Sequence, residues 1–165
     1  TDKILQVLRK GITVEDARNA FRWSREAGIS TLAYFMIGSP GETREDILQT
    51  IRLAKELNPD FVHITITTPF PSTELYREGL GEGIWKEDFW KSFAINPMKG
   101  FRPLYCEEQL CEEELMELLD YAYRSFYGRP VYVARQMMKI KSLRELRRKL
   151  KAGLKLLSPH RSVSW

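Results

Sequence analysis

The residues best suited to hold a ligand lie in segment 34–46. A largely apolar, uncharged run at 31–37 leads into Gly-Ser-Pro-Gly-Glu at 38–42, and the apolar residues after it return at helical spacing: Ile47, Ile51 and Ala54. This pattern predicts a strand, a tight turn and a helix, whose turn glycines let backbone N–H groups approach a ligand at the positive end of the helix. An ordinary turn that binds nothing would contain the same glycines.

A second candidate strand occupies residues 61–68 and has two different faces. One face is wholly apolar, and the other mixes aromatic and polar residues: Val62, Ile64 and Ile66 against Phe61, His63, Thr65 and Thr67. In a parallel barrel the apolar set would face the surrounding helices and the mixed set the lumen, where polar groups near a carboxyl end suit a ligand. For His63 we favour a core histidine satisfied by a neighbour over a ligand or a base.

The cysteines and histidines do not form a recognisable metal motif. Cys106 and Cys111 are the only two cysteines, and the two histidines, His63 and His160, are distant from them in sequence. A zinc site needs about four ligands and an iron–sulfur cluster needs clustered cysteines, so we interpret both cysteines as free thiols. From the sequence we identify no catalytic acid, no catalytic base and no metal ligand.

Helices alternate with the two strands, which is typical of a parallel α/β sheet. Thr13 and Asp16 form a predicted capping box, the helix after it has Ala17, Ala20, Phe21 and Ser24 on one face, and Gly28 is placed to end it. Thr43 is expected to cap the next helix, with Glu45 and Asp46 in its first turn. Asn58-Pro59-Asp60 ends that helix.

The second half of the chain is rich in aromatic residues. Pro69 and Pro71 end the second strand, a short helix begins at Glu74, and a loop-rich segment then carries Trp85, Phe89, Trp90 and Phe93. That segment could cover the mouth of a site and contact an apolar substrate, or be a lid packed on the core. A long helix is predicted over 112–127, with Leu115, Leu119, Ala122 and Phe126 on one face.

Composition indicates a globular chain with one main core. The 165 residues are 43% hydrophobic and 29% charged. No apolar run reaches the roughly 18 residues of a spanning helix, and no signal peptide pattern is present, so we expect a cytoplasmic location. The chain begins at Thr1 within a helical pattern, which suggests a piece of a longer protein.

Positive charge is concentrated near the C-terminus. Residues 124–161 contain 12 Lys or Arg and one acidic residue, a net charge of +11, whereas the remainder carries −7. Leucines at 143, 146, 150, 154 and 157 alternate with basic residues, which predicts a basic amphipathic helix. Such a helix could lie on an anionic membrane, dock on an acidic protein surface, or pack on its own domain; nucleic acid is not the expected partner.

Several motifs occur in an order that resembles one enzyme family. They are Arg9-Lys10-Gly11-Ile12-Thr13, Ala27-Gly28-Ile29, the segment 35–43, Pro59-Asp60, the segment 68–76 (Thr-Pro-Phe-Pro-Ser-Thr-Glu-Leu-Tyr) and the segment 123–130. Together they resemble the second half of a radical S-adenosylmethionine enzyme. The branch is the one with a cobalamin-binding domain, which includes anaerobic magnesium-protoporphyrin monomethyl ester cyclases and hopanoid-modifying enzymes.

The resemblance implies an α/β fold, the C-terminal part of a partial (βα)6 TIM-type barrel with two parallel strands and a helical extension. It also implies that the adenine side of the S-adenosylmethionine site is formed by Ile37, Gly38, Ser39, Pro40, Gly41, Glu42, Ile66, Thr67 and Thr68. The family's Gly-x-Ile-x-Gly-x-x-Glu pattern fits with departures, since Tyr34 and Met36 replace its first Gly and its Ile and one extra residue precedes Glu42.

The resemblance further implies cofactors and partners outside this chain. The parent enzyme would use S-adenosylmethionine and a [4Fe–4S] cluster, with cobalamin as an option, but the three-cysteine cluster loop of the family is absent here. The expected partner is the missing N-terminal half of the barrel. Self-association through an open sheet edge and peripheral membrane contact are further options.

Two functions follow as expectations. In the first, residues 1–80 are the last βα units of a radical enzyme, 81–130 an aromatic segment and helix near the substrate, and 131–165 a basic helical tail. In the second, the chain is a cofactor-free module that binds a protein or an anionic membrane through that tail.

Overall fold

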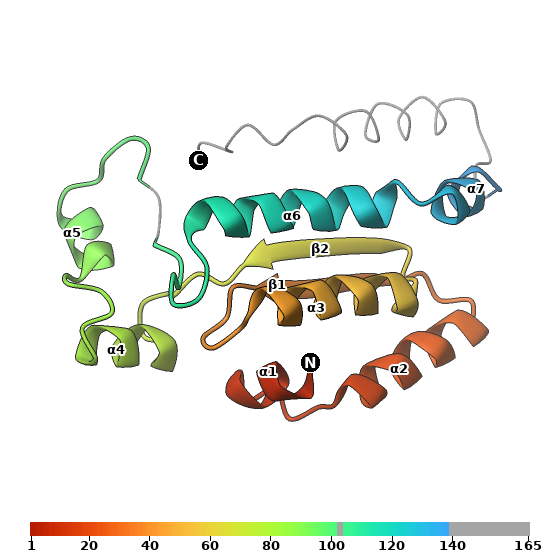
Figure 1. Cartoon of the computed structure of the whole chain (residues 1–165), viewed down its shortest axis with the longest axis horizontal. Coiled ribbons are helices and arrows are strands. Elements are labelled where there is room, and N and C mark those ends of the chain that lie inside the picture. The colour runs from red at the N-terminus through yellow and green to blue at the C-terminus, as the bar shows by residue number, and fades with distance from the viewer. Residues whose placement is uncertain (102–103, 139–165) are drawn as a thin grey trace.

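Two parallel strands, β1 (Leu32–Ile37) and β2 (Phe61–Ile66), form the sheet at the centre of the computed structural model (Figure 1). The register pairs Leu32 with Phe61 and Ile37 with Ile66. The structure describes residues 1–101 and 104–138. The predicted basic helix over residues 143–157, on which the membrane and assembly interpretation depends, lies outside the described residues.

Helices cover one face of this sheet. α3 (Arg44–Leu57) connects the two strands, and α6 (Glu112–Tyr127) runs beside β2 (Figure 1). Their apolar residues meet the alternate strand residues in one core: Ala33, Ile37, Ile47, Ile51, Ala54, Val62, Ile64, Ile66, Leu115, Leu118, Ala122, Phe126 and Tyr132. The prediction that Val62, Ile64 and Ile66 face the helices is therefore confirmed, as is the α/β class with parallel strands.

The expected helix ends are observed. α2 (Val14–Glu26) and α3 begin with reciprocal capping boxes, Thr13 with Asp16 and Thr43 with Asp46. Gly28 follows the end of α2 with φ +69°, and Asn58 ends α3 in the left-handed conformation. α1 (Asp2–Val7) precedes α2 and buries one residue, Ile4. No residue of α2 is fully buried, although its sequence is amphipathic.

The aromatic segment forms a second, smaller cluster. α4 (Glu74–Gly81) starts as predicted, but the segment expected to be a loop contains a helix, α5 (Phe89–Ile95), capped by Asp88. The buried members are Tyr76, Trp85 and Phe89, with Leu75, Leu80, Trp90 and Phe101 packed around them. The indole N–H of Trp90 donates to the Pro69 carbonyl at 2.7 Å, which fastens the cluster to the end of β2.

Two helices complete the described chain. α6 has the predicted bounds, but its buried face includes Leu118, whereas Leu119 is only partly buried. α7 (Pro130–Met138) follows directly and buries Tyr132. Within the described residues, no helix combines the length and the hydrophobicity needed to cross a bilayer.

The aromatic cluster predicts a test of packing at Gly79. A Cβ at this position would lie 1.8 Å from the ring of Trp85. We expect Gly79→Ala to lower the free energy of unfolding by about 1–3 kcal/mol, because the buried indole must move. Gly81→Ala, where no atom lies within 4 Å of the added Cβ, is the matched control and should be neutral or stabilising by up to about 1 kcal/mol. Equal unfolding midpoints for the two variants would contradict this packing.

Candidate functional site

The carboxyl ends of β1 and β2 meet in one corner. The Thr67 N–H donates to the Ile37 carbonyl at 2.8 Å, which continues the parallel ladder one step past the strands. The hydroxyls of Ser39 and Thr67 hydrogen-bond at 3.0 Å, and both residues are buried. The two segments named from the sequence as ligand-binding, 37–42 and 66–68, therefore lie side by side.

The turn between β1 and α3 is held in place by groups from other elements. Gly38 has φ +73°, and a Cβ there would lie 3.0 Å from a methyl carbon of Leu115 in α6. The Gly41 N–H donates to Glu108 at 2.7 Å, and Lys3 donates to the Gly41 carbonyl at 3.1 Å. No local sequence pattern predicts these long-range contacts.

Glu42 is a buried carboxylate at the end of this turn, with 2% of its surface exposed. Its Oε2 accepts the Ser39 N–H at 2.9 Å, and its Oε1 has no hydrogen-bond partner among the described residues. Burial raises the pKa of Glu42, while the N–H groups of Ser39 and Gly38 act in the opposite direction. A ligand hydroxyl or amine would relieve the unpaired oxygen.

Several predicted site residues do not present a side chain to this corner. Ile37 and Ile66 are buried in the core, so only their backbone could contact a ligand. The Thr68 hydroxyl donates to the Ile66 carbonyl at 3.3 Å. The favoured interpretation of His63 as a core residue is wrong. His63 alternates along β2 with the buried residues Val62 and Ile64, so it lies on the open face of the sheet and is exposed. The centroid of its ring lies 5.5 Å from that of Tyr34.

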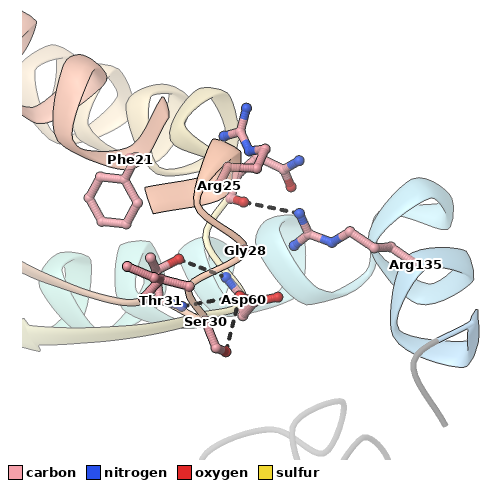
Figure 2. Close-up of a pocket in the computed structure, with 9 residues that line it drawn as sticks. Phe21, Arg25, Gly28, Ser30, Thr31, Asp60 and Arg135 are labelled. Atoms are coloured by element: carbon pink, nitrogen blue, oxygen red, sulfur yellow. Dashed lines mark hydrogen bonds between the residues drawn. The ribbon is translucent and has the colours of Figure 1, made fainter. Parts of the chain in front are cut away.

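A cavity of about 250 Å³ lies at the opposite, amino end of the strands (Figure 2). Arg25 donates to the Leu57 carbonyl at 2.7 Å, and Arg135 of α7 donates to the carbonyls of Asn58 and Pro59 at 3.0 and 2.7 Å. Asp60 accepts from the Ser30 hydroxyl and the Thr31 N–H, both at 3.1 Å. The two arginines thus satisfy carbonyls at the C-terminal end of α3 and just after it, which is a structural role that also complements the helix dipole.

The cysteines are both free, with Cys106 buried and Cys111 exposed. Burial raises the pKa of the Cys106 thiol, which makes it a poor metal ligand. Residues 1–101 and 104–138 contain no group of three or more His, Cys, Asp or Glu able to hold a metal ion. The described residues therefore do not fit an iron–sulfur cluster.

No protein-family model matches the chain. An uncharacterized methyltransferase of Pyrococcus horikoshii is 33% identical over 129 residues, which are 78% of this chain and 27% of that protein. The anaerobic magnesium-protoporphyrin IX monomethyl ester cyclase of Rubrivivax gelatinosus is 30% identical over 152 residues, which are 92% of this chain and 26% of the cyclase. A putative methylthiotransferase of Methanocaldococcus jannaschii is 32% identical over 75 residues, 46% of this chain and 17% of that protein. The chain thus spans about a quarter of the first two relatives.

The buried Glu42 carboxyl predicts a pH dependence of stability. Its pKa is raised in the folded protein, so between the ordinary carboxyl value of 4.5 and the raised value the folded state binds more protons than the unfolded state. The free energy of unfolding contributed by Glu42 therefore falls as pH rises through this window. Urea unfolding from about pH 4 to about pH 8 should show Glu42→Gln gaining stability over the wild type with increasing pH.

Glu45→Gln is the matched control, because Glu45 lies three residues away and is exposed. Its stability difference from the wild type should stay nearly constant across the same range. A Glu42→Gln variant that loses stability relative to the wild type as pH rises would contradict a raised pKa for this carboxyl.

Proposed function

Because the chain is homologous to radical S-adenosylmethionine enzymes, we propose that it supplies the adenine side of the S-adenosylmethionine site in a longer enzyme of this kind. The parent reaction we propose is a radical functionalisation of a C–H bond. The relatives' families use S-adenosylmethionine and a [4Fe–4S] cluster, and the two groups together would supply the one-electron chemistry for such a reaction. Cobalamin in the parent enzyme is part of the proposal and is assigned to no described residue.

The observation that carries this proposal is the corner joined by Ser39 and Thr67. Ligands of parallel α/β folds bind at the carboxyl ends of the strands, and this corner combines two such ends. It has a turn with glycines at φ +73° and +65°, the start of α3 and a buried carboxylate oxygen that lacks a partner among the described residues. These groups fit a nucleoside, whose hydroxyl and amino groups donate hydrogen bonds.

In this proposal each part of the corner has a separate task. The backbone of residues 37–42 and of Ile66 lies against the adenine or the ribose. The side chains of Ile37 and Ile66 are buried in the core and do not reach the ligand. Glu42 Oε1 accepts a hydrogen bond from the ligand. Ser39 and Thr67 fix the distance between the two walls through their hydroxyl contact. The cluster is held elsewhere in the parent, because the chain contains only two cysteines.

The aromatic cluster is the proposed substrate-side element. The cluster follows the carboxyl end of β2 in the chain, and the hydrogen bond from Trp90 to the Pro69 carbonyl holds it there. Phe70 remains 55% exposed while stacking on Trp90 with ring centroids 5.6 Å apart. An exposed aromatic face at the rim of the proposed site suits an apolar substrate.

Titration with S-adenosylmethionine tests the location of the site. We expect millimolar ligand to shift the backbone amide NMR signals of residues 38, 39, 41–43, 67 and 68, with weak affinity because the chain supplies only the adenine side of the proposed site. Thr67→Val should reduce these shifts, because the two walls lose their hydroxyl link. Adenine alone should shift a subset of the same signals.

The amide signals around the opposite cavity serve as the internal control. Gly28, Ser30 and Thr31 should not move during the titration. Shifts confined to these residues, or no shifts at all at millimolar ligand, would contradict the proposed site.

The isolated chain should lack the parent chemistry. After anaerobic incubation with iron and sulfide it should develop no cluster absorbance in the visible range, because two cysteines cannot replace the clustered ligands of an iron–sulfur centre. With S-adenosylmethionine and dithionite it should form no 5′-deoxyadenosine above the protein-free blank, measured by chromatography. Formation of 5′-deoxyadenosine above that blank would contradict the proposal that the cluster is held outside this chain.

A further inference from the structure

The cavity at the amino end of the strands brings two positive charges together. Arg25 of α2 donates to the Leu57 carbonyl at 2.7 Å. Arg135 of α7 donates to the carbonyls of the next two residues, Asn58 and Pro59, at 3.0 and 2.7 Å. Because the Cα atoms of successive residues are only about 3.8 Å apart, the two guanidinium groups are neighbours in space. Both arginines line the cavity (Figure 2).

These two arginines have more hydrogen-bond donors than the described residues use. A guanidinium group has five N–H donors. In the described part of the chain Arg25 donates one hydrogen bond and Arg135 donates two, all to backbone carbonyls and none to a carboxylate. The Nε of Arg135 is buried and has no partner among these residues. Since buried donors in native proteins are normally satisfied, this pair of arginines can accommodate a further acceptor.

The lining of the cavity has an excess of positive charge. Its charged groups are the two guanidinium groups and the carboxylate of Asp60, which accepts from the Ser30 hydroxyl and the Thr31 N–H. The carbonyls that the arginines contact carry no formal charge. Burial and the neighbouring charge of Arg135 lower the pKa of Arg129, the residue before α7. One negative charge would neutralise the lining, whereas a second would be repelled by Asp60.

The rest of the cavity wall includes apolar groups. Phe21 and Ile29 line it, and Figure 2 shows Phe21 of α2 and Arg135 of α7 approaching the cavity from different sides. The cavity volume is about 250 Å³. An apolar cavity of about 150 Å³ is already large enough to bind benzene. This cavity therefore has room for a ring-sized apolar body together with a charged group.

We propose that this cavity binds a small organic monocarboxylate, whose carboxylate accepts hydrogen bonds from Arg25 and Arg135 and whose apolar body lies against Phe21. The planar donor fork of a guanidinium matches the two oxygens of a carboxylate. Arg25 is exposed, so its side of the cavity is the entrance.

This site is distinct from the corner at the carboxyl ends of the strands and does not depend on the proposed function. S-adenosylmethionine carries a sulfonium and an ammonium group beside its one carboxylate, so it is a net cation and does not match the positively charged cavity. The two sites therefore respond to different ligands, and failure of one proposal leaves the other intact.

Titration of the whole chain with benzoate tests the site, because benzoate joins one carboxylate to a flat apolar ring. The backbone amide NMR signals of residues 28–31 and of Asp60 should shift with a dissociation constant in the millimolar range, while those of Ser39 and Thr67 stay in place. Benzamide, which has the same ring without the charge, is the matched control ligand and should leave all these signals unchanged. Equal shifts with the two ligands, or no shifts with benzoate at tens of millimolar, would overturn the proposal.

A pair of substitutions in α2 tests the role of the guanidinium. Arg25→Gln should weaken benzoate binding at least about tenfold, because a charge-assisted hydrogen bond is lost. Arg22→Gln is the matched control, since Arg22 is exposed one turn earlier and donates to Asn19. It should bind benzoate as the wild type does. Equal affinities of Arg25→Gln and the wild type would contradict the proposal.

Two measurements on the unsubstituted chain complete the test. Nuclear Overhauser effects should connect the benzoate ring protons with the ring of Phe21, and their absence at saturating benzoate would contradict the proposed orientation. Inorganic phosphate, mostly a dianion above neutral pH, should bind at least about tenfold more weakly than benzoate, because it is repelled by Asp60 and has no apolar body. Phosphate that binds as tightly as benzoate would overturn the assignment to a monocarboxylate.

Discussion

The parallel pairing of β1 with β2 is the constraint on which the rest of the structure depends. It sets the register that brings the Gly38–Glu42 turn beside Thr67, and it decides which backbone groups point to each outer edge. A shift by one residue would turn Val62, Ile64 and Ile66 away from α3 and α6 and expose the core. The same pairing therefore determines both the core and the proposed ligand corner.

Polar contacts from α6 and α7 hold this small sheet in place. A two-stranded sheet is marginal alone, and here it gains a helix layer whose tyrosines also satisfy the edge of β2. At the other end of the strands, Arg129 and Arg135 donate to carbonyls at the end of α3 and the turn after it. Burial raises the pKa of Tyr132 to about 12, so the hydroxyl remains a donor to Asp60 across the physiological range.

The sequence predicted what depends on local chemistry. The capping box at Thr13, the cap at Thr43, the turn at Gly28 and the alternation of β2 follow from residues within a few positions of each other, and all are observed. The contacts of Tyr123 and Tyr127 with β2 join residues about 60 positions apart, and no local pattern encodes them. α5 was missed because seven residues rich in aromatic side chains have weak helix propensity and fold only by packing on Trp85 and Phe101. His63 was misplaced because the described helices cover only the other face of the sheet, which no local pattern around His63 indicates.

The most direct test of the central claim is NMR scalar coupling across the hydrogen bonds of the sheet. We expect couplings from the Thr67 nitrogen to the Ile37 carbonyl carbon and from the Phe61 nitrogen to the Thr31 carbonyl carbon, which is the pattern of one parallel register. Couplings that instead connect residues in antiparallel order, or a register moved by one residue, would contradict the parallel pairing and the ligand corner built on it.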